Sequence, residues 1–262
     1  PDDIIIGTPD LAPTVVTIRD IFPGFGLPFT SSATFPLSRS PAVQAIMRLL
    51  EIPVAGFKRE DVIEAFSSPY IGLIPEGSTL TPAVIDRIAR NAQIIEGYSS
   101  WKNGFDLLEN RLKKTIESPD TPDYRVREAR TELENTQKSR KIVDHILTEL
   151  KGLERADICK AHIERIRSLL AGLKINNAAL LSEHEREDLR EFSDLLGELD
   201  NSSLFSAGEE MDYREFYRIL RAETGEKKIK GYAHQKGIKV TGIRELQQMK
   251  YPVVFLTGLT DA

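Results

Sequence analysis

A group of lysines near the end of the chain offers the clearest chemistry in the sequence. These lysines lie close together in the sequence, and Tyr232 and His234 lie among them. They are Lys227, Lys228, Lys230, Lys236 and Lys239. Lysines spaced in this way can contact the phosphates of a nucleic acid without reading its sequence. Lysines also protect exposed edge strands from unwanted pairing. By itself, the cluster favours this protective role.

Metal and nucleophile chemistry have little support in the sequence. The four histidines show no Cys/His or HExxH spacing. Cys159 and His162 are three residues apart on one expected helix face, but two ligands without partners do not make a metal site. We interpret Cys159 as a small apolar side chain of that helix. No GxxxxGK[ST] loop is found, so the chain lacks that device for holding a triphosphate.

Composition sets the broad class. The chain has 262 residues, of which 40% are hydrophobic and 29% charged, which is ordinary for a protein of one or two domains. A net charge of -5 argues against a general polyanion binder, although a local basic strip is compatible with it. The apolar runs fall short of a membrane span, and a single cysteine fits a reducing compartment. We therefore expect a cytoplasmic protein that has no membrane partner.

Strand patterns occur at both ends of the chain. DDIIIGTPD reads as a buried strand, residues 11–25 as a helix stopped by Pro23-Gly24, and LPFTSS as a second strand. At the other end, residues 238–243 and 253–256 read as two strands joined by a polar connector. The order strand, helix, strand is typical of an α/β unit. Each end is too small to make a sheet alone.

The middle of the chain is helical by pattern. SPAVQAIMRLLEI and TPAVIDRIARNAQII both begin with a capping residue followed by proline, and amphipathic segments continue to about residue 226. We therefore predict an α/β fold in which residues 1–55 and 227–262 pair in space as one domain with a parallel sheet. Residues 56–226 would form a large all-helical insertion. The prediction fails if the first and last strands do not share a sheet.

The two ends resemble the second RecA-like domain of UvrD/Rep-type helicases. In that family a strand ends near a threonine, a turn follows, and a second strand runs into a Val-Phe-x-x-Gly-Leu pattern. Here Thr241 would take the threonine position and VVFLTGL the second strand. The segment FKREDVIEAFSSPYIGL is similar to a region of AddB/RexB-type subunits of helicase–nuclease complexes. The resemblance implies a 2A-like domain built from both ends, with a 2B-like helical insertion.

Departures from the family pattern argue against a working motor. UvrD-type enzymes carry an arginine at the end of the first strand, where it reaches the nucleotide γ-phosphate; this chain has Gly7-Thr8-Pro9 there. In the family, the connector between the two strands couples the nucleotide state to DNA binding and carries lysine, glycine and glutamate. Here these positions fall on or near Leu246, Gln247 and Met249, whose uncharged side chains cannot make the same electrostatic contacts. We therefore interpret the chain as an excised, catalytically degenerate fragment with no catalytic residues and no cofactor of its own. ATP and Mg²⁺ would belong to the parent protein.

The resemblance implies a role in recombinational repair of DNA double-strand breaks. The chain would be a non-catalytic helicase-like domain of an ATP-dependent exonuclease/helicase subunit that guides DNA and scaffolds the complex beside a partner subunit. Its expected DNA contacts are the five lysines together with Thr241, Arg244 and Gln247. One alternative is the C-terminal half of an active UvrD-like DNA helicase. Another is a helical adaptor that binds protein partners.

Overall fold

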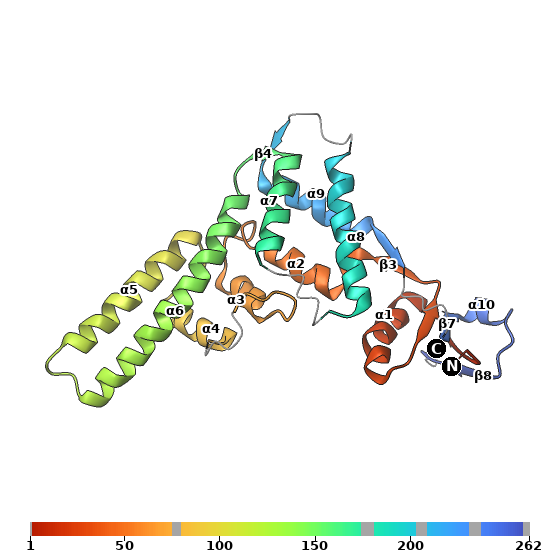
Figure 1. Cartoon of the computed structure of the whole chain (residues 1–262), viewed down its shortest axis with the longest axis horizontal. Coiled ribbons are helices and arrows are strands. Elements are labelled where there is room, and N and C mark those ends of the chain that lie inside the picture. Colours follow the sequence, from red (N-terminus) through yellow and green to blue (C-terminus); the bar gives the residue numbers. More distant parts are fainter. Residues whose placement is uncertain (1, 75–79, 174–180, 203–208, 231–236, 259–262) are drawn as a thin grey trace. The chain divides into compact units, whose positions relative to one another are not determined.

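The computed structural model describes residues 2–74, 80–173, 181–202, 209–230 and 237–258. The chain is α/β and divides into two compact units (Figure 1). Unit 1 combines Pro1–Ser40 with Glu223–Ala262, and unit 2 is Pro41–Ala222. The first boundary lies at Ser40, before the expected residue 55, so helix α2 (Pro41–Glu51) belongs to unit 2; the second lies at Glu223, a few residues before the expected residue 227.

Unit 1 contains a four-stranded parallel sheet built from both ends of the chain. Its strands are β1 (Ile4–Thr8), β2 (Phe29–Ser31), β7 (Ile238–Gly242) and β8 (Val253–Leu256), in the order β2-β7-β1-β8. On either side of β1, Ile5 is in register with Lys239 and with Val254. The prediction that the first and last strands share one sheet is therefore confirmed.

Helices cover the two faces of this sheet. The connections β1 to β2 and β7 to β8 cross the sheet in opposite directions, so right-handed crossovers place α1 (Leu11–Ile21) and α10 (Ile243–Leu246) on opposite faces. On the α1 face, Val15 and Ile18 pack with Phe29, Ile238 and Val240 as a buried apolar cluster. Side chains alternate along a strand, so Lys239 and Thr241 of β7 lie on the face of α10. Gly7 of β1 lies on that face too, next to Leu246 of α10.

Unit 1 also contains a short antiparallel ribbon of two strands. Strand β3 (Thr34–Pro36) pairs with β6 (Lys228–Lys230), with Phe35 opposite Ile229 and both side chains buried. Just beyond the ribbon, in the 3-10 turn Leu37–Arg39, the Leu37 N–H donates to the Lys227 carbonyl at 2.8 Å. The segment that leaves unit 1 and the segment that returns to it are therefore hydrogen-bonded to one another.

Gly237 begins the last part of the sheet with a backbone that only glycine adopts readily. Its φ is +151°, and a Cβ there would lie 2.5 Å from the carbonyl oxygen of Pro28. The close approach lets the Ile238 N–H donate to that same carbonyl at 2.9 Å. A single glycine thus allows β7 to join β2.

Unit 2 is mostly helical. Besides α2 its helices are α3 (Arg59–Ser67), α4 (Pro82–Asn91), α5 (Tyr98–Glu117), α6 (Asp123–Leu153), α7 (Cys159–Gly172), α8 (Glu183–Asp200) and α9 (Tyr213–Glu226), whose last turn lies in unit 1. Two short strands, β4 (Asp157–Ile158) and β5 (Glu210–Met211), pair antiparallel. Helices α5 and α6 lie side by side as a long hairpin (Figure 1).

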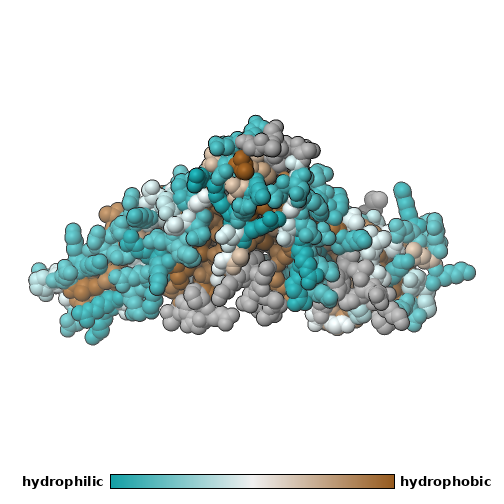
Figure 2. All heavy atoms as spheres, turned by 45° about the horizontal axis from the view of Figure 1, so that its top comes forward, coloured by the Kyte–Doolittle hydropathy of each residue, from teal (hydrophilic) through white to brown (hydrophobic). Residues whose placement is uncertain are grey.

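Caps and buried aromatic residues fix these helices. Thr81 accepts a hydrogen bond from the Val84 N–H ahead of α4, and Ser182 forms a capping box with Glu185 at the start of α8. The Trp101 indole of α5 is buried and donates to the Phe57 carbonyl at 2.9 Å. Hydrophilic residues predominate on the face drawn in Figure 2, with hydrophobic residues showing between them.

Candidate functional site

The lysine cluster occupies more than one kind of position in unit 1. Lys228 and Lys230 are both exposed on β6, because the intervening Ile229 is buried. Alternate residues of a strand lie on one face about 7 Å apart, so these two ammonium groups can act together. Lys227 is half-buried just before the strand, and Lys239 is half-buried in the centre of the sheet. Lys236 lies outside the described residues.

The three other expected DNA contacts differ in exposure. Thr241 is only 1% exposed, and its hydroxyl donates to the Glu245 carboxylate. In this position the Thr241 hydroxyl is not presented to a phosphate. Arg244 on α10 and Gln247 just after it are exposed. Lys228 and Lys230 thus lie on the same face of one strand, whereas Thr241 is buried and is not exposed as they are.

The carboxyl edge of the sheet is where a parallel α/β sheet usually binds its ligand. Here Leu246 of α10 lies over the end of β1, because a Cβ added to Gly7 would be 2.6 Å from the Leu246 Cδ2 atom. Leu256 of β8 approaches the same point at 3.1 Å. Two apolar side chains therefore pack against Gly7, the next-to-last residue of the interior strand β1.

Polar groups at this edge are satisfied locally. Thr8 is 1% exposed, and its hydroxyl oxygen is 2.9 Å from that of Thr14 on α1. The Thr257 N–H donates to the Gly7 carbonyl at 3.0 Å. On the α10 face, Glu245 accepts from the Thr241 hydroxyl, and its negative charge would repel a nucleotide phosphate. The arrangement at this edge is that of a packed end of a sheet.

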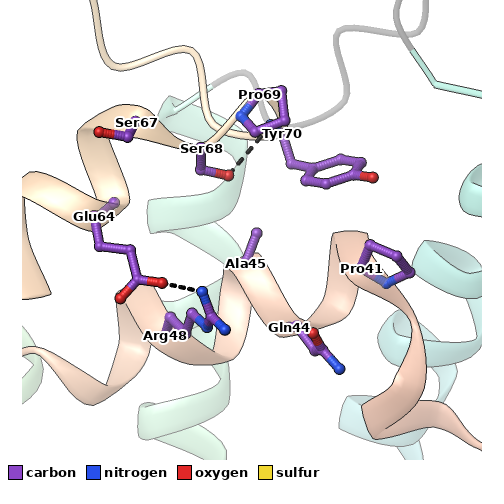
Figure 3. A pocket seen from close by; sticks show the side chains of 10 residues that line it. Pro41, Gln44, Ala45, Arg48, Glu64, Ser67, Ser68, Pro69 and Tyr70 are labelled. Carbon is purple, nitrogen blue, oxygen red and sulfur yellow. Dashed lines mark hydrogen bonds and ion pairs between the residues drawn. The ribbon is translucent and has the colours of Figure 1, made fainter. Parts of the chain in front are cut away.

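A pocket of about 300 Å³ lies in unit 2 between α2 and the end of α3 (Figure 3). Arg48 and Glu64 form an ion pair at one end of it, and Pro41 and Tyr70 stand at the other. It includes the Ser-Pro-Tyr segment that the family resemblance singled out, residues 68–70.

The serines of this pocket are engaged with backbone groups. The Ser67 hydroxyl donates to the Ile63 carbonyl at 2.9 Å, and the Ser68 hydroxyl oxygen accepts from the Tyr70 N–H at 3.3 Å. The described residues that line the pocket include no histidine, lysine or cysteine that could activate a serine. The carboxylate that lines the pocket, Glu64, is paired with Arg48, and both serine hydroxyls are engaged with the backbone.

Tyr70 also ties this pocket to α8. Its hydroxyl donates to the Glu185 carboxylate at 2.7 Å. Burial alone would raise the pKa of Glu185, but hydrogen bonds from Ser182 and Tyr70 outweigh it and hold that pKa below its ordinary value. Glu185 is therefore a charged structural link between the loop and the helix cap.

Cys159 and His162 are core residues of unit 2. His162 is fully buried, stacks on Phe216 with ring centres 5.0 Å apart, and has its Nε2 atom 3.1 Å from the Met211 carbonyl oxygen. Burial raises the pKa of the Cys159 thiol to about 11, so the thiol is protonated near neutral pH. Within the described ranges, no group of three or more His, Cys, Asp or Glu side chains is placed to hold a metal ion.

Unit 2 has a second concave surface that was not predicted from the sequence. Residues of α4, α5 and α6 line a groove of about 820 Å³ that includes Arg87, Tyr124, Arg125 and Arg127. The sequence reasoning missed it because α5 was not anticipated as a separate helix. The available signal was the spacing of Trp101, Phe105 and Leu108 along one helix face.

Comparisons with known proteins add no relative. Neither the protein-family models nor the curated protein sequences include a match to this chain. Of the helices in the described part of the chain, none is both long enough and apolar enough to cross a membrane. The functional argument therefore depends on the geometry of the two units.

Proposed function

We propose that this chain is a non-catalytic, helicase-like domain of an AddB/RexB-type subunit, which scaffolds an ATP-dependent helicase–nuclease complex and guides DNA. Unit 1 would be the RecA-like part of that domain and unit 2 its helical insertion. The role would be in repair of DNA double-strand breaks, beside a helicase–nuclease partner subunit.

The sheet of unit 1 is the observation that carries this proposal. Strand β1, from the beginning of the chain, lies between β7 and β8 from its end, and unit 2 is inserted between them. A simple helical adaptor does not require its two ends to form one parallel sheet. The split sheet supports the helicase-like reading over the adaptor.

The packed carboxyl edge favours a scaffold over a motor. Hydrolysis of a nucleoside triphosphate needs cations that stabilise charge on the transferred phosphate. At the end of β1 this chain instead has Gly7, covered by Leu246, followed by the buried Thr8. The same edge would have to bind nucleotide if the chain belonged to an active UvrD-like helicase.

Lys228 and Lys230 are the contacts that we assign to the DNA backbone. Both are exposed on one face of β6 and so can face the same strand of phosphates. Their protective role remains the alternative, because among the described strands β6 pairs only with β3. The two roles predict different results when the charges are removed.

The test is binding of fluorescently labelled single-stranded DNA, measured by anisotropy over a range of salt concentrations. Replacing both lysines (Lys228→Gln with Lys230→Gln) should weaken binding and reduce the slope of log K against log salt by about 1.4, at about 0.7 for each phosphate contact. The control is Lys102→Gln with Lys160→Gln, two exposed lysines of unit 2. If the lysines of β6 only protect an edge, the first variant should bind DNA normally and aggregate.

A second measurement addresses the motor alternative. Titration calorimetry with MgATP should show no binding, and single-stranded DNA should stimulate no hydrolysis. Saturable ATP binding would instead favour the C-terminal half of an active helicase. Absence of DNA binding by the wild-type chain would count against the guidance role.

A further inference from the structure

The groove between α4, α5 and α6 has a chemistry that the lysines of β6 do not supply. We propose that it is a second contact surface for single-stranded DNA, in which Tyr124 stacks on a base and Arg125 and Arg127 hold the neighbouring phosphates. The inference rests on the proposed DNA-guiding function but uses a different unit and different residues.

The groove has the size and construction of a binding surface. Its volume of about 820 Å³ falls within the range of about 300 to 1,000 Å³ that is typical of ligand sites. All three helices that line it belong to unit 2. Leu112 of α5 and the buried Ala129 of α6 give it an apolar floor. Sugar and base surfaces can pack on such a floor.

Two of the three arginines of the groove form no ion pair in the described part of the chain. Arg87 is held at 2.6 Å by Glu132, which also accepts from Asn91, so this pair is neutral. Arg125 and Arg127 are exposed, and neither has a carboxylate partner in the described part of the chain. The three arginines against Glu128 and Glu132 leave a net charge of +1, in a chain whose total is -5.

Tyr124 adds an aromatic surface at the rim of the groove. Its side chain is 52% exposed at the start of α6. The Arg125 guanidinium lies 6.0 Å from the centre of the ring, and its Nε–H donates to the tyrosine hydroxyl at 3.2 Å. An exposed ring beside arginines is the combination that binds single strands without sequence preference, by base stacking and phosphate contact.

The exposed Tyr124 ring favours DNA over an acidic peptide as the ligand, because it can stack on a base. Glu128 lines the groove one helical turn after Tyr124, and its carboxylate would repel the carboxylates of a peptide and the phosphates of DNA alike. A DNA base near Tyr124 carries no charge, and the amino group of cytosine can donate to a carboxylate. A groove with arginines, an exposed ring and one acid therefore fits a nucleotide strand better.

The test uses oligo(dC) and oligo(dT) with the full chain, by fluorescence anisotropy. Tyr124→Ala should weaken binding about tenfold, as expected for the loss of one stacked base, whereas Tyr124→Phe should bind like the wild type. Arg125→Gln with Arg127→Gln should reduce the salt slope by about 1.4. The control is Arg130→Gln with Lys141→Gln, two exposed cations of α6 that do not line the groove. All variants change exposed side chains, and circular dichroism checks that they fold.

The outcomes separate this inference from the proposed function. If the groove variants bind DNA like the wild type while the Lys228/Lys230 variant does not, the groove proposal is overturned and the DNA-guiding function stands. If the wild-type chain binds no DNA, both are overturned. If a poly-glutamate peptide competes with DNA and Tyr124→Ala binds that peptide normally, the groove is an acidic-peptide site and the proposal is wrong.

Discussion

The end of β1 shows how a few side chains decide what a sheet can do. Gly7 leaves space that Leu246 and Leu256 fill, and Thr8 turns its hydroxyl toward Thr14. None of these groups carries the positive charge that a bound triphosphate needs. The glycine and the connector leucine were both visible in the sequence, but their contact follows only from the crossover that carries α10 over β1.

His162 gives a prediction at the residue scale. Burial lowers its pKa from the ordinary value of 6.5; the Met211 carbonyl opposes this, and the nearby Arg165 reinforces it. The unfolded chain therefore binds more protons than the folded chain below pH 6.5. The stability contributed by neutral His162 is complete above that pH and declines as the pH falls.

The measurement is urea denaturation between pH 7.5 and 5. The free energy of unfolding of unit 2 should fall more steeply with pH in the wild type than in His162→Phe, which keeps a ring against Phe216. The other titrating groups are common to both proteins, so the difference reports on His162. Equal slopes would show that this histidine is not the source of the acid sensitivity.

Sequence reasoning reached some of these residues and not others. The interpretation of Cys159 as a small apolar side chain of its helix is confirmed, because the residue is buried in α7. The burial of Thr241 could not be foreseen, because it depends on β7 being an interior strand beneath α10. An exposed and a buried threonine look the same until the sheet order is known.

At the scale of elements, β8 differs from the other strands of its sheet. Its four residues are all apolar, yet their side chains are between 41% and 55% exposed. Among the described strands β8 pairs only with β1, so its outer edge is an unpaired row of backbone groups. Such an edge without charged residues is prone to pair with other chains.

We therefore expect the chain to self-associate as its concentration rises. Val254→Lys should reduce this association, because a charge on an edge strand opposes pairing, and sedimentation equilibrium measures it. Leu107→Lys is the matched control: Leu107 is 70% exposed but lies in helix α5, whose backbone is already hydrogen-bonded. An equal effect of both substitutions would assign the association to general hydrophobicity.

The elements themselves were largely predictable from the sequence. The apolar run of β8 and the capped start of α4 were predicted correctly, because strong local patterns specify them. Helix α2 begins at Pro41 as expected, but the buried Ser40 hydroxyl makes no hydrogen bond in the described part of the chain and so does not cap it. The run VVFL predicted an apolar strand, and its exposure accompanies its place at the edge of the sheet. Strand β3 was not predicted, because three residues are too few to show the alternation of apolar and polar side chains that marks a strand.

At the scale of the whole molecule, the chain has two units with separate cores. Domains of this kind need not unfold in a single step. Gly237→Ala should destabilise unit 1 by about 1 to 3 kcal/mol, since φ at this position is +151°. Leu150→Ala should destabilise unit 2 by about 2 to 5 kcal/mol, because Leu150 is fully buried in α6.

Hydrogen exchange measured by mass spectrometry reports the two effects separately. The glycine substitution should accelerate exchange in β1 and β7 and leave α6 unchanged, and the leucine substitution should do the reverse. Gly152→Ala, at a position where a Cβ meets no atom within 4 Å, is the control for the glycine change. Acceleration in both units by either substitution would mean that they unfold as one.

The β3–β6 ribbon has a mechanical consequence. The chain leaves the ribbon after Pro36 and re-enters it at Lys228, and these two residues are paired at the same end of the ribbon. If the segments after Leu37 and before Lys227 were pulled apart, the force would act first on the Leu37–Lys227 hydrogen bond. The residue pairs of the ribbon would then separate one after another, starting with Pro36 and Lys228. Sequential opening resists little force, so a pull on the inserted helices would release β3 from β6 while the parallel sheet stays intact.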